Sequence, residues 1–247
     1  MYTTSDLAGQ ATISPRSPFR LSFSHAYMSS QRKQVPSGFE NLDNWPRGGM
    51  FRSMGLEIFR PVPPIRKLLE PRLEAVYKSE IFSNNGPQLK ELEQRLADYL
   101  CVDSSMVVAT ASGTVALQAA CWVADCTNWR APGWTFPASV AAPLSLGHSV
   151  SLVDVSPSDW MGVLDDIPAD TGAIKVVPFG ATFDQTVWQS DGEIIVDAAA
   201  SLAAEPRGVS AIPERGAVVF SLHATKAMGG VEGGVAVFGS HERAVRA

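Results

Sequence analysis

Apolar residues recur with helical spacing in two segments of the first half of the chain. In residues 65–78 and 88–100 they stand three or four positions apart, which places them along one side of an α-helix. A turn-forming stretch, 82–87, separates the two segments, and the prolines of 59–64 exclude helix before the first one. The pattern therefore predicts two amphipathic helices joined by a turn.

Short, nearly continuous apolar runs replace this pattern from residue 106 onward. Continuous apolar character is typical of strands that are buried on both faces of a mainly parallel sheet. Helical or loop stretches separate the runs, so we expect an α/β protein with three layers, α/β/α, around a mainly parallel seven-stranded sheet. The predicted strands are 106–110, 129–132, 150–155, 174–178, 194–196, 217–220 and 235–238.

The N-terminal residues differ from the rest of the chain in composition. Residues 1–55 are rich in Ser, Arg, Pro, Gly and Gln and show no sustained hydrophobic period. Such composition is typical of segments that do not form a packed core. We expect a poorly ordered extension at 1–55 and one large domain at 56–247, because the 45% of hydrophobic residues suffices for a sizeable core.

Charge and cysteine content narrow the class of protein. The formal net charge is −5 and no basic stripe interleaved with aromatic residues is present, so we expect no nucleic-acid partner. The three cysteines, Cys101, Cys121 and Cys126, form no CxxC pair, which indicates reduced, mostly buried thiols and no metal site. No apolar run is long enough to span a membrane and the N-terminus lacks a signal sequence, which predicts a cytoplasmic protein without a membrane partner.

Residues that follow the predicted strands are the candidate site, because ligands of parallel α/β sheets bind beyond the carboxyl ends of the strands. The first run is followed by Ser112, Gly113 and Thr114, which open a helix. Free backbone N–H groups and the helix dipole at such a turn can bind a phosphate. The same residues also fit an ordinary N-cap, and neither a Walker A loop nor a GxGxxG motif is present.

Two aromatic residues follow the second run. Trp134 and Phe136 lie in the loop after 129–132, where an aromatic side chain can cover the face of a planar ligand. Core packing is the more common role of a single aromatic residue, and we expect it for Trp134. Asp154, which follows the first residues of the third run, 150–152, is expected to organise a turn, and 178–180 to be a turn of close backbone approach.

Asp197 and Lys226 indicate a catalytic site more strongly than the other strand-end residues do. Asp197 follows a buried strand and precedes small residues, and a buried carboxylate without a partner is costly. Its partner is either a helix N-terminus or the protonated ring nitrogen of a flat ligand. Lys226 lies in the turn 221–226 between two buried strands, where burial would lower the pKa of its amine and let it attack a carbonyl carbon. A solvated loop lysine is the alternative reading of this stretch alone.

Together these features match the needs of one cofactor, pyridoxal phosphate (PLP). PLP requires an anion site for its phosphate, an aromatic ring against its face, a carboxylate at its pyridine nitrogen and a lysine for its aldehyde. Each requirement has a candidate at a strand end of this sequence.

The same motifs resemble the DegT/DnrJ/StrS-type PLP-dependent aminotransferases of fold type I, which are best known for aminating keto sugars on nucleotide carriers. The resemblance extends from about Phe59 to the C-terminus, and its most specific part is 221–226 with the glycine-rich 232–234. The other motifs that carry it are 85–87, 92–93, 96–97, 112–117, 135–136, 153–155, 178–180 and 197–199.

The resemblance implies a role for each candidate residue. Lys226 would be the catalytic residue, which forms the internal aldimine with PLP and then moves a proton between the substrate α-carbon and C4′ of the cofactor. Asp197 would pair with the pyridine nitrogen, and Phe136 rather than Trp134 would stack on the ring. The residues that hold the phosphate would be Gly113, Thr114 and Ser221.

The resemblance also implies a reaction and partners. An amino acid, usually glutamate in the family, would donate the amino group, and a keto sugar, nucleotide-linked, would accept it. Active sites of the family lie at dimer interfaces, which implies a homodimer.

The sequence departs from the family in two respects. Ala200 stands where the family often has a Gln near the phenolic oxygen of the cofactor. The family's C-terminal small domain is absent from the sequence, so we expect a fragment or a truncated form. A non-catalytic PLP-binding remnant and another fold-type-I PLP enzyme, such as a cysteine desulfurase or an aldolase, remain as alternatives.

Overall fold

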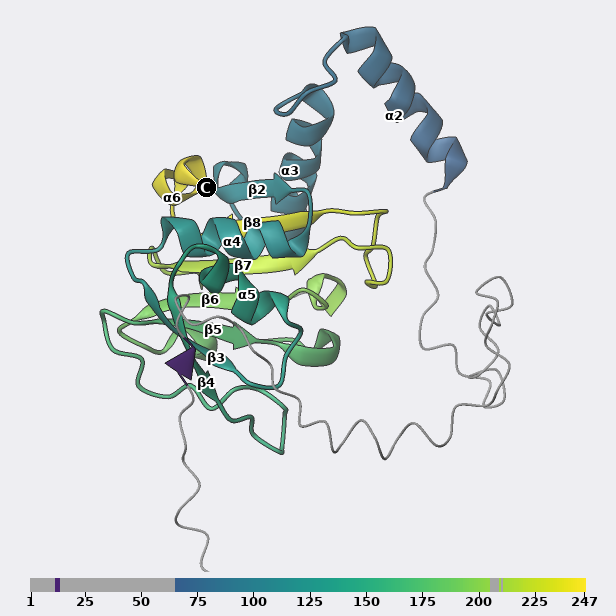
Figure 1. The fold of residues 1–247 in the computed structure, drawn as a ribbon. Coiled ribbons are helices and arrows are strands. Elements are labelled where there is room, and N and C mark those ends of the chain that lie inside the picture. Colours follow the sequence, from purple (N-terminus) through teal and green to yellow (C-terminus); the bar gives the residue numbers. More distant parts are fainter. Residues whose placement is uncertain (1–11, 14–64, 205–208, 210) are drawn as a thin grey trace, which may run out of the picture. The chain divides into compact units, whose positions relative to one another are not determined.

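The computed structural model describes residues 12–13, 65–204, 209 and 211–247 (Figure 1). Of the predicted extension 1–55, only Thr12–Ile13 fall within the described residues, where they form a short strand. The predicted boundary between residues 55 and 56 lies outside them.

Both early helices and all the predicted strands are present, which confirms the α/β fold class. The helices are α2 (Arg66–Ser79), α3 (Pro87–Leu100), α4 (Gly113–Val123), α5 (Ala138–Ser145) and α6 (His241–Arg246). The strands are β1 (Thr12–Ile13), β2 (Val107–Thr110), β3 (Asn128–Pro132), β4 (Ser149–Val153), β5 (Gly172–Val176), β6 (Glu193–Asp197), β7 (Gly216–Ser221) and β8 (Gly234–Phe238). Short 3₁₀ turns are η4 (Ser104–Met106), η5 (Pro178–Gly180), η6 (Gln185–Trp188) and η7 (Leu202–Ala204).

The strands form one sheet in the order β1-β4-β3-β5-β6-β7-β8-β2. The neighbours from β4 to β7 are parallel, whereas β8 is antiparallel to both β7 and β2. The segment between β7 and β8 contains no crossover helix, and a direct connection of neighbouring strands produces an antiparallel pair. β1 adds an antiparallel strand at β4, which the sequence pattern did not predict because two residues carry no periodic signal.

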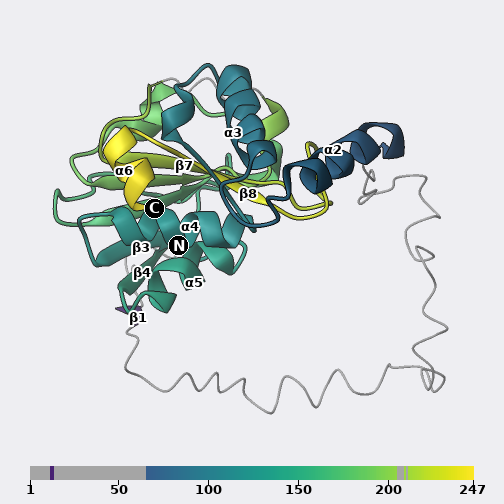
Figure 2. The same cartoon turned by 90° about the horizontal axis from the view of Figure 1, so that it is seen from above.

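The central strands are buried on both faces, as their continuous apolar runs predict. Along β7, Val218 and Phe220 belong to the core on the α3 side, whereas Ala217 and Val219 belong to the core on the side of α4 and α5. This alternation follows from the period of two in a β-strand. Figure 2 shows α3 on one face of the sheet and α4 and α5 on the other. Three layers result.

α2 has the predicted helical conformation but contributes no buried residue to either core. Two of its apolar side chains, Leu68 and Tyr77, are 66% and 71% exposed. Arg72 connects α2 to α3 through bonds to Gln88 and Glu91. The amphipathic pattern therefore predicts the helix correctly, although its apolar side chains remain largely uncovered in the described part of the chain.

The cysteines differ in burial. Cys121 and Cys126 are buried and Cys101 is exposed, and all three are free thiols. Burial raises the pKa of the Cys126 thiol to about 12. Among the described residues, none of the helices combines the length and the apolar character that crossing a bilayer requires.

Candidate active site

Asp197 is the last residue of β6 and lies in the interior, with 5% of its surface exposed. Its Oδ2 accepts a hydrogen bond from Ser139 Oγ at 2.6 Å, and its Oδ1 accepts one from the backbone N–H of Ala199 at 3.2 Å. Burial raises the pKa of the Asp197 carboxyl, while these two hydrogen bonds and the positive charge of Lys226 act in the opposite direction. The site therefore contains a desolvated carboxylate that is held in place from two sides.

Ser139 is the residue of this site that the sequence analysis missed. It is fully buried in the first turn of α5, and its Oγ also lies 2.9 Å from Thr135 Oγ1. Ser139 N–H donates to the carbonyl of Phe136 at 3.1 Å, so that Phe136 lies within the turn that these bonds close. The sequence signal for this arrangement is the four-residue spacing of Thr135 and Ser139 beside a helix start, which is too common to identify a site alone.

A second group of candidates lies where β7 ends beside the start of α4. A Cβ placed on Gly113 would lie 3.0 Å from Ser221 Cβ, so any other residue would require Ser221 or the helix start to shift by a few tenths of an ångström. Gly234 of β8 pairs with both Thr110 and Ser221 and thereby connects the two segments. Ser221 Oγ accepts a hydrogen bond from His223 N–H, which leaves its own proton free for donation to a ligand.

The start of α4 has features of both interpretations given for it, an ordinary N-cap and a turn that can bind a phosphate. Ser112 is the N-cap, and its Oγ accepts a hydrogen bond from Val115 N–H at 3.3 Å. The N–H groups of Gly113 and Thr114 in the first turn have no carbonyl of their own helix to bond, as at any helix N-terminus. Ser112 therefore acts as an ordinary N-cap, and the free N–H groups beside it are the kind of donors that a phosphate site requires.

Lys226 lies in the segment that connects β7 to β8. Its backbone N–H donates to the carbonyl of His223, and its carbonyl accepts from Gly229 N–H, each at 2.9 Å. Its side chain is partly exposed, so the burial expected for this lysine is incomplete. The charge of Lys226 nevertheless acts on the Asp197 carboxyl, where it opposes in part the rise in pKa that burial causes.

The loop between β3 and α5 contradicts one expectation. Trp134 does not pack in the core: it is 49% exposed and contacts two other aromatic rings. Phe136 is 76% exposed, and its ring is available to a ligand. Asp154 Oδ1 accepts a hydrogen bond from the N–H of the next residue, Val155, at 2.8 Å, but Asp154 lies just before the bridge between Val155 and Gly162 and not in the turn expected for it.

Trp134, Trp160 and Phe179, here called the aromatic cluster, come from the loops after β3, β4 and β5. The ring centroid of Trp134 lies 5.1 Å from that of Trp160 and 5.6 Å from that of Phe179. Trp160 and Phe179 have positive φ angles of 62° and 57°, a conformation that bulky residues rarely adopt. All three side chains are at least 48% exposed.

The turn that carries Phe179 lies against the segment that follows Asp197. Gly180 has a φ of 74°, and a Cβ on it would lie 3.0 Å from the carbonyl oxygen of Ala200. The expected close backbone approach at 178–180 is therefore present. It brings the aromatic cluster to the same edge of the sheet as Asp197.

These residues fit the PLP that the resemblance implies. An ionised carboxylate has about four acceptor positions, and the two bonds to Asp197 leave capacity for the N–H of a protonated ring. The close approach of Gly113 and Ser221 combines main-chain donors with a hydroxyl donor, as a phosphate site requires. The structure brings Asp197, Ser221 and the Gly113 turn to the carboxyl ends of β6 and β7.

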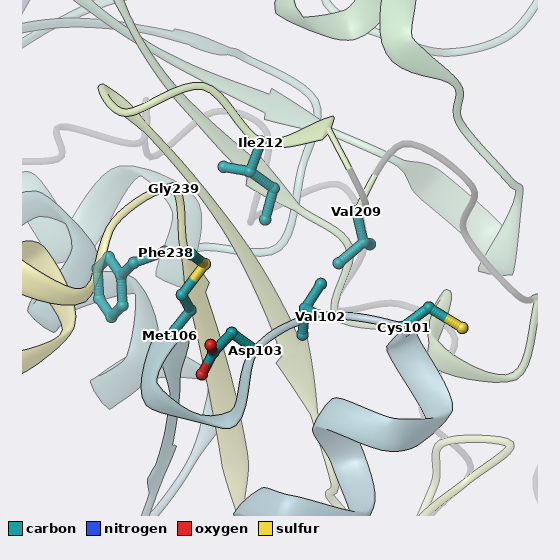
Figure 3. Close-up of a pocket in the computed structure, with 8 residues that line it drawn as sticks. All are labelled: Cys101, Val102, Asp103, Met106, Val209, Ile212, Phe238 and Gly239. Carbon is teal, nitrogen blue, oxygen red and sulfur yellow. The ribbon is translucent and has the colours of Figure 1, made fainter.

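A hollow elsewhere in the fold does not belong to this site. It is lined by residues of the turn after α3, of the segment before β7 and of the end of β8 (Figure 3). Its one carboxylate, Asp103, accepts a hydrogen bond from Ser105 N–H at 2.8 Å and caps η4. This hollow lies at the end of β8 remote from Gly234, and it contains none of the candidate residues.

Comparison with known proteins gives a consistent result. Residues 63–247 match the DegT/DnrJ/EryC1/StrS aminotransferase family. The dTDP-4-amino-4,6-dideoxy-D-glucose transaminase of Shigella dysenteriae is 27% identical over an alignment of 198 residues, and the match covers 73% of this chain and 52% of that protein.

Solved structures share the fold. DesI, determined with its TDP-sugar product, is 28% identical with a TM-score of 0.64, over 77% of this chain and 51% of DesI. A Streptococcus pneumoniae chain in the PMP form is 24% identical with a TM-score of 0.59, over 74% of this chain and 52% of that chain. The chain thus spans about half the length of these relatives.

The family match includes every candidate residue between Gly113 and Lys226, and it agrees with the fold of the described residues. The chain belongs to the DegT/DnrJ/EryC1/StrS aminotransferase family, whose cofactor is pyridoxal phosphate.

Proposed function

We propose that this chain forms the PLP-binding part of a sugar aminotransferase, which transfers an amino group from glutamate to a nucleotide-linked keto sugar. The observation that carries the proposal is the buried Asp197 carboxylate, which lies at a strand end beside the Gly113–Ser221 contact and within reach of the charge of Lys226. The name of the Shigella transaminase and the TDP-sugar product of DesI support the sugar acceptor.

PLP, when bound, supplies an aldehyde that reacts with amines and a protonated ring that withdraws electrons from the substrate α-carbon. Asp197 would keep the proton on the ring nitrogen, because its desolvated carboxylate gains a positive partner there. Gly113, Thr114 and Ser221 would bind the phosphate through main-chain N–H and hydroxyl groups.

Lys226 would bind the cofactor's aldehyde carbon through Nζ and, once displaced by the substrate amine, carry a proton at the substrate α-carbon. Phe136 would lie against the ring face, since its side chain is exposed and its turn is bonded to Ser139. These roles rest on the family resemblance together with the positions of the residues described above.

The aromatic cluster supports a ring-bearing acceptor. Exposed tryptophan and phenylalanine faces suit a nucleobase or the apolar face of a pyranose. The cluster lies at the same sheet edge as Asp197, because the turn of Phe179 contacts the backbone at Ala200. Positive φ angles at Trp160 and Phe179 store strain of a kind that clusters at ligand sites.

We also propose that the functional form is a homodimer. The exposed apolar side chains of α2, such as Leu68 and Tyr77, support a surface that a second copy covers. Light scattering of the purified chain tests this, and a monomer at all concentrations would contradict it.

The decisive experiment adds PLP to the purified chain and follows its visible absorption. Borohydride reduction followed by peptide mass spectrometry should place the label on Lys226. Lys226→Ala should abolish the label, whereas Lys90→Ala, which removes an exposed lysine of α3, should leave it unchanged. Label on any other lysine would overturn the assignment.

Glutamate distinguishes an aminotransferase from the two alternatives. Added to the PLP-loaded chain, it should convert the cofactor to its amino form with release of 2-oxoglutarate. Bound PLP without this half-reaction would favour a non-catalytic PLP-binding protein. Conversion of added cysteine to alanine, or cleavage of an added β-hydroxy amino acid to glycine and an aldehyde, would favour another PLP enzyme.

A further inference from the structure

Ser139 has a single hydroxyl proton but two oxygen neighbours. One is the Asp197 carboxylate at 2.6 Å and the other is the Thr135 hydroxyl at 2.9 Å. An ionised carboxylate only accepts hydrogen bonds, so Ser139 gives its proton to Asp197. Ser139 must then accept a hydrogen bond from Thr135. The hydrogen bonds therefore run in one direction, with Thr135 donating to Ser139 and Ser139 donating to Asp197.

Protonation of Asp197 would reverse this order. The carboxyl would then be able to donate to Ser139, Ser139 would donate to Thr135, and the Thr135 proton would need another acceptor. The direction of the hydrogen bonds from Thr135 through Ser139 thus depends on the charge of Asp197, and therefore on any charged group that binds Asp197. Burial makes this response strong, because Ser139 is fully buried and Asp197 is 5% exposed, so water cannot easily replace either hydrogen bond.

The same serine also holds the turn of Phe136. Ser139 N–H donates to the Phe136 carbonyl, and the Thr135 to Ser139 contact spans that residue on the side-chain side. Phe136 is therefore bonded directly to Ser139 through its carbonyl, and its neighbour Thr135 is bonded to the Ser139 hydroxyl. The two groups assigned to the ring face and to the ring nitrogen are held through one residue, the first by its main chain and the second by its side chain.

We propose that Ser139, supported by Thr135, is a positioning residue that fixes the Asp197 carboxylate and ties the Phe136 turn to it. The inference rests on the proposed PLP binding, in which Asp197 and Phe136 contact the cofactor ring. Ser139 itself acts only through these two residues.

The first test needs no cofactor. In the full chain labelled with ¹³C at aspartate side chains, the Asp197 carboxyl is titrated by NMR, with Asp197→Asn used to assign the signal. Ser139→Ala should raise the pKa of Asp197, because the hydrogen bond from Ser139 favours the ionised form. Ser145→Ala, on the exposed part of the same helix, should leave the titration unchanged.

The second test uses PLP labelled with ¹⁵N at its ring nitrogen. In Ser139→Ala the ring-nitrogen shift should move toward the unprotonated value, and the PLP dissociation constant should increase about tenfold, as expected for one lost hydrogen bond to a charged group. Ser139→Thr keeps the hydroxyl and should restore the shift. Thr135→Val, at a partly exposed position, should give a smaller change in the same direction and serves if Ser139→Ala does not fold.

The outcomes separate this inference from the proposed function. A folded Ser139→Ala variant with an unchanged Asp197 titration and unchanged ring-nitrogen shift would overturn the positioning role. A wild-type chain that binds no PLP would contradict the proposed function, while the cofactor-free titration would still decide whether Ser139 controls Asp197.

Discussion

Arg243 of α6 forms a bidentate ion pair with Glu193, the first residue of β6. Its Nη1 bonds Glu193 Oε1, its Nη2 lies 3.2 Å from Glu193 Oε2, and the same Nη2 lies 3.0 Å from Asp125 Oδ2. The side chains of Glu193 and Arg243 are 1% and 7% exposed. This pair fastens α6 to the sheet at the edge opposite Asp197.

Arg243→Met should destabilise the chain by about 3–5 kcal/mol, because it leaves the Glu193 carboxylate buried with the more distant Arg215 as its remaining cationic partner among the described residues. Urea denaturation measures the loss. The double variant Glu193→Gln with Arg243→Met should recover most of it. Arg246→Met, in the exposed part of the same helix, is the control, and an equal effect of the two single variants would contradict the prediction.

Gly113→Ala should weaken PLP binding by about tenfold or more, which corresponds to at least ~1.4 kcal/mol. The added Cβ would lie 3.0 Å from Ser221 Cβ and would push apart the two segments proposed to hold the phosphate. Absorbance titration with PLP measures the change. Gly133→Ala is the matched control, since its Cβ would lie at an ordinary 3.6 Å from the carbonyl oxygen of Val153. Equal affinity in both variants would argue against a phosphate site at Gly113.

Asp197→Asn should stabilise the chain at pH 7 in the absence of cofactor. Burial raises the pKa of Asp197, so the folded state disfavours the ionised form. That cost is present above the folded-state pKa and vanishes below the unfolded-state pKa, because both states are then protonated. The gain from Asn should therefore disappear at acid pH, which denaturation at several pH values would show.

Asp184→Asn is the control, because the pKa of Asp184 is shifted in the direction opposite to that of Asp197. Hydrogen bonds from Thr186 lower the pKa of Asp184, so its ionised form favours the folded state above the ordinary pKa of an aspartate. No gain in stability is expected from Asn there at pH 7. A destabilised Asp197→Asn chain at neutral pH would show that its hydrogen bonds outweigh the cost of burial.

Phe179→Gly should weaken binding of a thymidine diphosphate–linked sugar by about tenfold, through loss of stacking on an aromatic face. Glycine suits the φ of 57° at this position, so the backbone should be retained. Calorimetry measures the affinity for the thymidine diphosphate–linked sugar. The affinity for PLP should stay unchanged. Trp122→Ala removes an exposed aromatic residue of α4 as a control. Unaltered sugar binding in Phe179→Gly would exclude the aromatic cluster from the acceptor site.

The sequence by itself determined the class of fold and the identity of the candidate residues. Continuous apolar runs predict strands buried on both faces, and these strands are present with Ala217 and Val219 on one side and Val218 and Phe220 on the other. The order of Gly113, Asp197 and Lys226 at strand ends was sufficient to indicate PLP, because each chemical requirement of the cofactor is met by a local motif.

Only the tertiary structure decided what surrounds these residues. Ser139 lies 58 positions from Asp197 in the chain, and Glu193 lies 50 positions from Arg243, so no local pattern could pair them. Trp134 was expected in the core but lies with Trp160 and Phe179, because three loops meet at the edge of the parallel strands. Periodicity reports which face of its own element a residue occupies, whereas the packing of distant elements decides which partner it contacts there.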